Sequence, residues 1–529
     1  MAGADTTRHE GGIVTTDART ELSRRSFVRA AAVGGLLAGS GVAAELFRAV
    51  PATAGSSLVA TDPNLHLLRR ATFGPTPATL KEIRRLGRNR WLDRQLHPST
   101  VKDTFCRDYV ADRYPDLDMT LARAYRTLDG SWDLMHRLGQ ATIVRQTWSD
   151  RQLFEVMVDF WSNHLNVTNP HEACWWSRHD YDRRVIRKHA LGKFKNMLRA
   201  SATHPAMMAY LNNAESTKTN PNENYGREIL ELHTVGVDGG YDEEDMRQST
   251  LTLTGFGFGW DTGEFEFHDW AHHTGRVRVM KWTHANTNPK KGKDVGLAYV
   301  DYLARHPKTA QRLARKLCVR FVSDDPPRGL VDALAETYLD HDTAIVPVLE
   351  RLFRSKAFAR SVGQKVRRPF EDVAASLRIL NVGPDPEGID GQQALYWAIQ
   401  GLGHLPMGWV PPDGYPDTAD PWRSAGLTLG RWNTHMALAG GWWPADHLKT
   451  PDLRKSLLPK KLPKTHGGLV DVLAKRLVFR KLSPAHRAAI LTFLGRNAGD
   501  ALDDDDAAVG WRLPYVVALI LDSPSHGIR

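Results

Sequence analysis

Apolar residues recur at helical spacing along most of this 529-residue chain, and that periodicity limits the fold more than any other feature. Leu80, Ile83 and Leu86 share one face of a predicted helix. Thr76 and Pro77, just before them, suit the N-cap and the first helical position. Further amphipathic patterns of the same kind follow toward the carboxyl end, so helices should dominate the fold.

Strand signals are few by comparison. Residues 256–267, rich in glycine and aromatic side chains, could form a hairpin, and a brief alternation follows at 277–281. Two long loops, 260–293 and 406–423, interrupt the helical pattern, and long ordered loops often carry function. We therefore predict a mainly α fold: a large multi-helix single domain over residues 55–529, with long ordered loops and at most a small β-hairpin.

Residues 1–54 have the organisation of an export signal. Ser23-Arg24-Arg25-Ser26-Phe27-Val28-Arg29 resembles the twin-arginine consensus, and a weakly apolar segment, 30–44, follows it. Ala52-Thr53-Ala54 supplies a small-residue cleavage site, so Gly55 would begin the mature chain. The pattern predicts export by the twin-arginine pathway, which carries folded cargo, and an extracellular or envelope-associated location.

The charge balance indicates what the mature chain could bind. The formal net charge is +10, which suits an anionic or glycan component of the cell envelope, although basic side chains can also serve solubility alone. No zinc-finger or RNA-binding signature occurs, so nucleic acid is not an expected partner, and no motif indicates a protein partner. Beyond the signal, no apolar stretch approaches the ~20 residues needed for a transmembrane segment.

Three cysteines, Cys106, Cys174 and Cys318, are too few for a disulfide scaffold. One disulfide and one free thiol after export is an alternative. A buried, unpaired thiol is the expected state of at least Cys318, which lies in an apolar helical pattern.

The most distinctive polar pattern lies between Tyr225 and Val235. On a helix, Asn224, Glu228 and Glu231 form a stripe at one edge of the apolar face, so two carboxylates and an amide lie together. Asn222 or Asn224 could cap the helix. Gly226, in the first turn, either weakens the helix or permits the close approach of another backbone.

A second helix, around residues 154–165, brings more polar groups. His164 flanks its apolar stripe and can reach a neighbouring helix, whereas Asp159 lies on the opposite face. If the two helices pack together, His164 converges with Glu228 and Glu231, and Asp159 joins them only if its helix is covered on both faces.

Three interpretations of this convergence remain open. Glu228 and Glu231, with Asp159 as a weaker third, could be acid/base groups of a glycan hydrolase, positioned by His164, Asn224 and Arg227. The many tryptophans in loops, such as Trp260, Trp270, Trp282, Trp409 and Trp422, would then stack on sugar rings. The same groups could bind a metal, although their spacing matches no common metal motif. Finally, the glutamates could be structural partners of Arg227, Arg183 or Arg184.

The loop at 260–293 contains further candidate metal ligands. His268, His272, His273 and His284 lie close in sequence, and three histidines can bind zinc. Loop histidines are also often simply solvated. The sequence identifies no cofactor, and a divalent metal held by His164 or by these histidines is the one to test.

Six motifs in order carry a resemblance to a known family: Arg69-Arg70-Ala71-Thr72-Phe73-Gly74, Phe160-Trp161-Ser162-Asn163-His164-Leu165-Asn166-Val167, Ala202-Thr203-His204-Pro205-Ala206-Met207, Asn222-Glu223-Asn224-Tyr225-Gly226-Arg227-Glu228-Ile229-Leu230-Glu231-Leu232-His233, Thr252-Leu253-Thr254-Gly255-Phe256, and Pro411-Pro412-Asp413-Gly414-Tyr415-Pro416. Together they resemble the bacterial family catalogued as domain of unknown function 1800, best over residues 60–440. The resemblance implies a secreted bacterial protein and no particular chemistry. Gly403-His404 and His272-His273 depart from the family pattern.

The absence of other motifs narrows the chemistry. No GxSxG elbow, P-loop or dinucleotide fingerprint occurs in the sequence, which argues against serine esterase and nucleotide chemistry. The expectation is a hydrolase acting on an envelope or extracellular glycan by carboxylate chemistry. The alternatives are a metal-binding exported protein and a non-enzymatic envelope-binding or scaffold protein.

Overall fold

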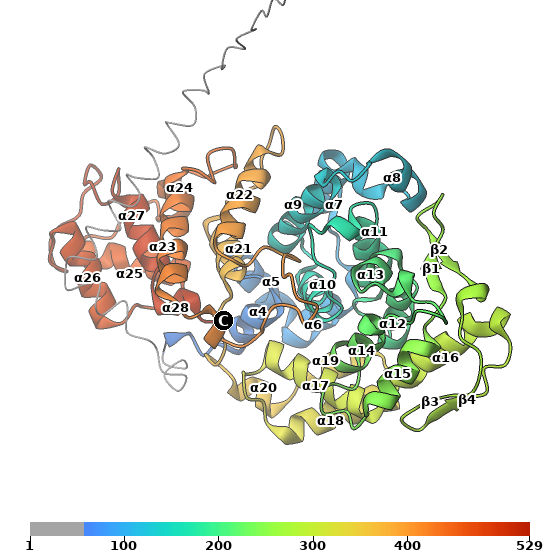
Figure 1. Ribbon diagram of the computed structural model, residues 1–529. Helices are drawn as coiled ribbons and strands as arrows, with labels where there is room; N and C mark the ends of the chain where they lie inside the picture. Colours follow the sequence, from blue (N-terminus) through green and yellow to red (C-terminus); the bar gives the residue numbers. More distant parts are fainter. Residues whose placement is uncertain (1–57) are drawn as a thin grey trace, which may run out of the picture. The chain divides into compact units, whose positions relative to one another are not determined.

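The computed structural model describes residues 58–529, and most of them lie in helices (Figure 1). The predicted mainly α fold is confirmed. The predicted export signal lies outside the described residues. No helix in the described part of the chain is long and apolar enough to cross a membrane.

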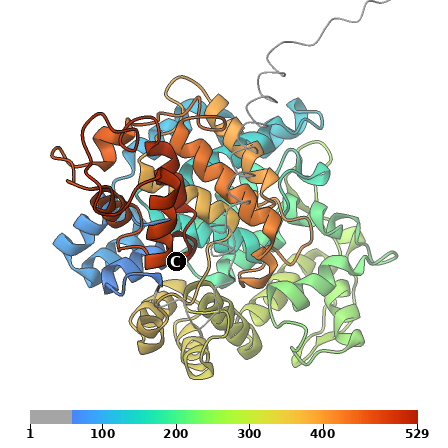
Figure 2. The ribbon, with the colours of Figure 1, turned by 90° about the vertical axis from the view of Figure 1, so that its left-hand side faces the viewer.

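The helices fall into three successive stretches. The first comprises α4 (Pro63–Ala71), α5 (Pro77–Leu86), α6 (Arg88–Leu96), α7 (Thr104–Arg113), α8 (Leu121–Thr127), α9 (Asp133–Trp148), α10 (Gln152–His164), α11 (Arg178–Tyr181), α12 (Phe194–Ala202), α13 (Pro205–Tyr210) and α14 (Glu223–Glu228). The second comprises α15 (Glu243–Thr252), α16 (Gly292–Ala304), α17 (Pro307–Phe321), α18 (Arg328–Asp340), α19 (Ile345–Phe353) and α20 (Lys356–Arg360). The third comprises α21 (Pro369–Leu380), α22 (Asp390–Gly401), α23 (Ala425–Gly440), α24 (Leu453–Leu457), α25 (His466–Leu477), α26 (Pro484–Leu494), α27 (Leu513–Leu521) and α28 (Pro524–Gly527). Figure 2 views this last stretch from its own side, where α23 packs along α27.

Two antiparallel hairpins are the only sheets in the described residues, one more than the sequence predicted. Strand β1 (Phe256–Phe258) pairs with β2 (Phe265–Phe267), as expected for 256–267. Strand β3 (Val277–Val279) pairs with β4 (Trp282–His284), so the brief alternation noted in the sequence is a second hairpin.

Helix α10 lies in the main hydrophobic core. Its apolar stripe packs into this core, with Met157 and Trp161 at 0% exposure, and the Trp161 indole Nε1 donates to the Ala190 carbonyl at 2.9 Å. The opposite face is covered as well, because Asn163 and Asp159 contact other segments there. Helix α10 therefore presents polar groups to the protein interior on a face that the sequence left open to solvent.

Local signals in the sequence account for several helix starts. Thr76 forms the predicted cap of α5, in a capping box with Thr79 and with Pro77 at the first position. Asn222 caps α14 by accepting from the backbone N–H of Asn224 at 3.1 Å.

The central motif departs from the regular helix that the sequence predicted. Helix α14 ends at Glu228, and residues Ile229–His233 continue as a π-helical segment, η6. A π-helical turn widens the backbone and changes the angular relation of Glu231 to Glu228, and such turns are frequent at functional sites.

Close packing fixes the start of the same helix. A Cβ at Gly226 would lie 2.2 Å from Thr250 Oγ1 and 2.8 Å from Thr250 Cα on α15. The Ser249 hydroxyl donates to the Gly226 carbonyl at 2.9 Å. Gly226 therefore permits the close approach of α15, one of the two roles that the sequence left open.

The three cysteines are all buried and free, as expected for Cys318. Burial raises the pKa of the Cys174 thiol and of the Cys318 thiol to about 12, so both are inert thiols.

Candidate functional site

Two of the sequence motifs meet in space at Asn163 and Tyr415. The Asn163 Nδ2 amide donates to the Tyr415 carbonyl at 2.6 Å, and the Tyr415 N–H donates to Asn163 Oδ1 at 2.6 Å. Gly414 has φ +76°, and a Cβ there would lie 2.0 Å from the Asn163 carbonyl oxygen. The close approach therefore requires glycine at this turn of the 406–423 loop.

Neighbouring polar side chains fix the same loop further along. The Asn166 Nδ2 amide donates to the carbonyls of Trp409 (2.9 Å) and Pro411 (2.8 Å). The Tyr210 hydroxyl donates to the Val410 carbonyl at 2.6 Å. The loop is thereby held against the end of α10 and presents Asp413 on the surface, where Trp409 Nε1 donates to Asp413 Oδ1 at 2.8 Å.

Glu228 lies near this loop and is the least constrained carboxylate of the central motif. Its side chain is half-buried and makes no hydrogen bond or ion pair with any residue from 58 to 529. Burial raises its pKa, the charges of Glu231 and Asp413 raise it further, and the charge of Arg227 opposes them. Glu228 thus belongs to a group of three carboxylates, of which Asp413 comes from the distant loop.

Glu231 and Arg227 behave as a structural pair. Arg227 lies 3.5 Å from Glu231 and 3.7 Å from each of Glu223 and Glu243. Of the three arginines predicted as structural partners of the glutamates, Arg227 contacts Glu231, and Glu228 forms no ion pair with it.

The other two arginines proposed as partners of the glutamates lie elsewhere. Arg183 pairs with Asp180 at 2.6 Å and with Asp118 at 3.5 Å, and Arg184 lies 3.9 Å from Asp180. Neither arginine contacts Glu228 or Glu231. Asn224 contacts Asn212 at 3.3 Å.

His164 faces a lysine and not the glutamates. Lys316 Nζ, on α17, lies 3.1 Å from His164 Nδ1, while His164 Nε2 lies 3.1 Å from the His233 carbonyl. Because a carbonyl only accepts, Nε2 carries the ring proton and Nδ1 accepts from Lys316. Both ring nitrogens are thereby engaged, and a metal ion at Nδ1 would have to displace the Lys316 amine.

Lys316 was not singled out from the sequence, yet its environment is unusual. Burial, followed by the charge of Arg312, lowers its pKa to about 8, against the opposing charges of Asp417 and Asp413. Burial, followed by the charge of Lys316, holds the pKa of His164 well below its usual range. Asp413 thus acts on both Lys316 and Glu228, which places an acid and an amine with shifted pKa values around one loop.

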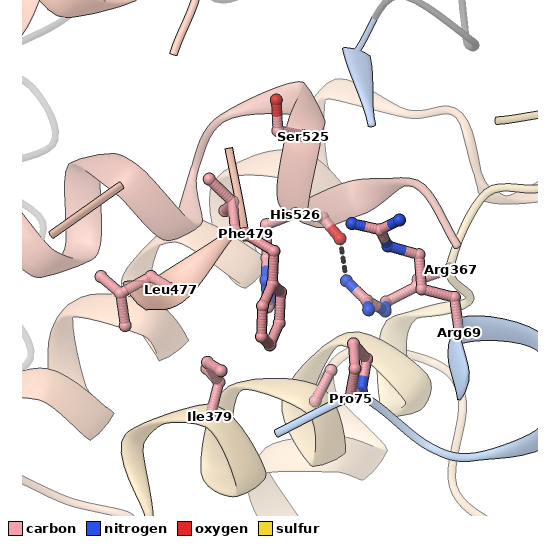
Figure 3. Close-up of a pocket in the computed structure, with 10 residues that line it drawn as sticks. Arg69, Pro75, Arg367, Ile379, Leu477, Phe479, Ser525 and His526 are labelled. Atoms are coloured by element: carbon pink, nitrogen blue, oxygen red, sulfur yellow. Dashed lines mark hydrogen bonds between the residues drawn. The ribbon is translucent and has the colours of Figure 1, made fainter. Parts of the chain in front are cut away.

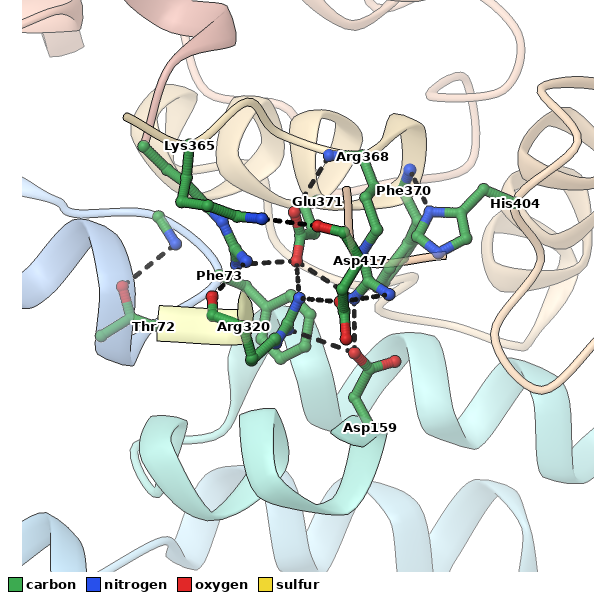
Figure 4. Close-up of polar contacts among 12 residues, drawn as sticks. Thr72, Phe73, Asp159, Arg320, Lys365, Arg368, Phe370, Glu371, His404 and Asp417 are labelled. Carbon is green, nitrogen blue, oxygen red and sulfur yellow. Dashed lines mark hydrogen bonds and ion pairs between the residues drawn. The ribbon is translucent and has the colours of Figure 1, made fainter. Parts of the chain in front are cut away.

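Asp159 belongs to a buried ionic network and not to this group (Figure 4). Arg368 Nη2 donates to Asp159 Oδ2 at 2.6 Å, and Arg320 Nη2 donates to it at 3.2 Å. Both arginines also contact Asp417, at 3.3 and 3.4 Å. Two guanidinium groups thus hold the Asp159 carboxylate, and an acid/base role for it stays a prediction.

The network continues inward from these residues. Glu371 accepts from Arg320 at 2.5 Å, from Arg368 at 3.1 Å and from Arg529 at 2.8 Å. Burial alone would raise the pKa of Glu371, but the three guanidinium charges hold it well below its usual range. Lys365 joins the network through the Asp417 carbonyl at 2.5 Å. The network ties α10, α17, α21 and the 406–423 loop together.

The histidines of the 260–293 loop do not gather into a group of three ligand atoms. His272 is buried, with Nδ1 2.8 Å from the Thr254 carbonyl and Nε2 3.0 Å from Asn286 Oδ1. His268 lies 3.8 Å from Glu266, and His284 Nδ1 accepts from the Asn286 N–H at 2.9 Å. Hydrogen bonds to the protein engage both ring nitrogens of His272, and His268, His272 and His273 do not bring three ligand atoms together, so nothing in their arrangement supports the predicted metal site.

The loop tryptophans divide into two classes. Trp260 and Trp270 are 77% and 66% exposed, which is consistent with a stacking surface. Trp422 is buried, 4.8 Å from the His404 ring, and Trp282 packs 5.2 Å from Tyr299. His404 itself accepts from the Phe370 N–H at 3.1 Å, so this departure from the family pattern has a packing role.

The sequence model of the family described as "Protein of unknown function (DUF1800)" matches residues 66–527. The chain belongs to this family. No curated protein and no solved structure matches it. Three motifs that are separate in the sequence of this DUF1800 protein lie close together in its structure. Asn163 and Asn166 bind the loop that carries Asp413. Glu228, from the central motif, lies within electrostatic reach of Asp413.

Proposed function

We propose that this DUF1800 protein is an exported hydrolase that cleaves an envelope or extracellular glycan by carboxylate acid/base chemistry. Glu228 is the general acid and Asp413 the second carboxylate, which serves as base or nucleophile. Glycoside hydrolysis needs such a pair, with one member kept protonated by its surroundings.

One observation carries the proposal: Glu228 is half-buried, has no hydrogen-bond or ion-pair partner among residues 58–529, and has a raised pKa. A carboxyl group that only served packing would be expected to pair, as Glu231 does with Arg227 at 3.5 Å. A raised pKa favours the protonated form of an unpaired carboxyl group, which is the form that donates a proton to a leaving group.

Lys316 and Tyr210 complete the surroundings. Burial raises the pKa of Tyr210, with contributions from Asp413 and Glu228, so Tyr210 lies within electrostatic reach of both carboxylates. Lys316 lies within reach of Asp413 and can bind an anionic or hydroxyl group of a substrate. Export by the twin-arginine signal of residues 1–54 would bring the site to the envelope.

The test is a panel of purified envelope and extracellular glycans, incubated with the full-length chain and assayed for new reducing ends. The proposal expects release from at least one glycan, and loss of that release in Glu228→Gln. Glu387→Gln is the matched control, since Glu387 is exposed and its side chain has no partner in the described part of the chain. Release that persists in Glu228→Gln would contradict the assignment.

A non-enzymatic glycan-binding role is the second candidate, because Trp260 and Trp270 are 77% and 66% exposed. It predicts retention on an insoluble envelope glycan that is weakened by Trp260→Ala and Trp270→Ala but unchanged in Glu228→Gln. Retention without any release of reducing ends would favour this candidate over the hydrolase.

A further inference from the structure

Three side chains capable of binding a metal ion lie close together in the structure, on helices that follow Glu228 by more than 100 residues in the sequence. Asp372 of α21, His435 of α23 and His526 of α28 are all buried, and one ligand atom from each lies within 4.8 Å of the others. His435 Nε2 is 2.8 Å from Asp372 Oδ2, and His526 Nε2 is 3.6 Å from Asp372 Oδ1. No other such group of three occurs in residues 58–529.

One carboxylate oxygen of this group lacks a hydrogen-bond partner. Asp372 is 1% exposed, yet its Oδ1 accepts no hydrogen bond, whereas Oδ2 accepts from Arg431 Nε at 3.0 Å. A buried carboxylate oxygen without a donor is uncommon in folded proteins and indicates an unseen cation or water.

Neighbouring side chains form hydrogen bonds with the proposed ligands, as is usual around metal sites. His435 Nδ1 lies 2.8 Å from Asp522 Oδ1, so a carboxylate orients this imidazole from behind. Histidines that bind metals commonly donate their other ring N–H to a carboxylate, and metal-binding carboxylates are themselves hydrogen-bonded, as Asp372 is by Arg431. Ser376 Oγ lies 2.9 Å from His526 Nε2 and borders the same group.

We propose that Asp372, His435 and His526 bind one divalent transition-metal ion of the Zn²⁺ class. Two imidazole nitrogens and one carboxylate oxygen form a ligand set that Zn²⁺ accepts, with a fourth position left for Ser376 Oγ or water. The ion cross-links α21, α23 and α28, which are far apart in the sequence, and so stabilises the packing of the last helix.

A small pocket borders one of the three proposed ligands (Figure 3). Arg69, Arg367, Phe479 and His526 are among the residues that line it. The Arg367 guanidinium also donates to the His526 carbonyl, which fixes α28 against the pocket wall.

The rival arrangement needs no metal. In it, His435 carries a proton between Asp372 and Asp522, each 2.8 Å away, and the cluster is an ionic network. The two arrangements differ in whether the protein retains a metal, so they can be separated without knowing the activity.

The experiment uses the full-length chain without an affinity tag, stripped with a chelator and then supplied with Zn²⁺ or Co²⁺. The proposal expects one retained ion per chain, a visible Co²⁺ ligand-field spectrum and a melting temperature that rises with Zn²⁺ concentration. His435→Gln and His526→Gln should abolish all three. Asp522→Asn, which keeps every ligand, should weaken binding about 10–100-fold.

His273→Gln and His284→Gln are the matched controls, since these side chains lie in the 260–293 loop away from the cluster. They should bind like the unmodified chain. Absence of retained metal and of any Zn²⁺ effect on melting in the unmodified chain would overturn the proposal in favour of the ionic network. Loss of the ion in the loop variants instead would also overturn it.

Discussion

Lys316 Nζ lies 3.1 Å from Nδ1 of His164, a histidine that is buried and whose other ring nitrogen faces the His233 carbonyl. The pair joins α17 to the end of α10, beside the loop that presents Asp413. It explains why a histidine in a prominent motif contacts neither glutamate of the central helix. It also places an amine with a lowered pKa within electrostatic reach of Asp413.

The first prediction concerns the pH dependence of Lys316. Its pKa is lowered to about 8, so it should become neutral, and reactive toward an acylating reagent, at a lower pH than other lysines. Quantitative mass spectrometry of labelling against pH should give a midpoint near 8 for Lys316, below the ordinary lysine value of about 10.4. A midpoint for Lys316 at the ordinary lysine value would show that burial does not shift this amine.

The same shift affects stability with a defined sign. Between pH 8 and the ordinary lysine pKa of about 10.4, the unfolded chain binds a proton at Lys316 that the folded chain has released. The Lys316 contribution to the free energy of unfolding therefore rises with pH across this window. Below pH 8 the folded chain keeps the Lys316 ammonium charged, so burial of that charge lowers stability by its full amount.

The second prediction concerns the two hydrogen bonds by which Asn163 of α10 binds the 406–423 loop. Asn163→Ala removes both 2.6 Å hydrogen bonds to Tyr415, so amides of the loop should exchange with deuterium faster while amides of α10 stay protected. If the loop positions Asp413 for chemistry, glycan hydrolysis should fall without a comparable loss of melting temperature. Unchanged deuterium exchange of the loop amides would show that these two hydrogen bonds do not hold the loop against α10.

The third prediction tests the packing of the central helix. Gly226→Ala puts a methyl group 2.2 Å from Thr250 Oγ1, so the free energy of unfolding should fall by about 1–3 kcal/mol. Gly426→Ala on α23 is the control, because a Cβ there meets open space, and it should be neutral or slightly stabilising. Urea denaturation measures both, and equal effects at the two glycines would argue against a close approach of α15.

The fourth prediction concerns the buried ionic network. Arg320→Leu leaves Asp159, Glu371 and Asp417 with one cation fewer, and breaking a buried pair typically costs about 3–5 kcal/mol. The surface pair of Arg247 and Glu244, 2.8 Å apart, is the matched control, and Arg247→Leu should cost less than about 1 kcal/mol. The free energy of unfolding from denaturation should separate the two variants, and similar small losses would mean that the network is solvated.

Much of the fold follows from local signals in the sequence. The mainly α architecture, the Thr76 cap, the hairpin at 256–267 and the role of Gly226 all depend on periodicity, capping chemistry or backbone freedom that neighbouring residues reveal. The second hairpin was visible only as a brief alternation, because its strands have three residues each.

The site was harder to predict because it depends on contacts between distant segments. Lys316 and Asp413 join the group only through packing of α17 and the 406–423 loop, and no spacing rule links them to Glu228. Asp159 looked solvated because periodicity identifies one apolar face, whereas Arg320 and Arg368 cover the other. His272 looked free because the partners of its ring nitrogens, Thr254 and Asn286, are remote in sequence.

The most direct test of the proposed chemistry is the rate at which the full-length chain releases reducing ends from an envelope glycan, compared with Glu228→Gln at equal melting temperature. General acid catalysis by Glu228 predicts a decrease of about 10²–10⁴-fold in the variant. It also predicts that the unmodified rate falls as pH rises through the raised pKa of Glu228, because the donor must be protonated. Equal rates in the two proteins, or no release from any glycan by the unmodified chain, would contradict the account.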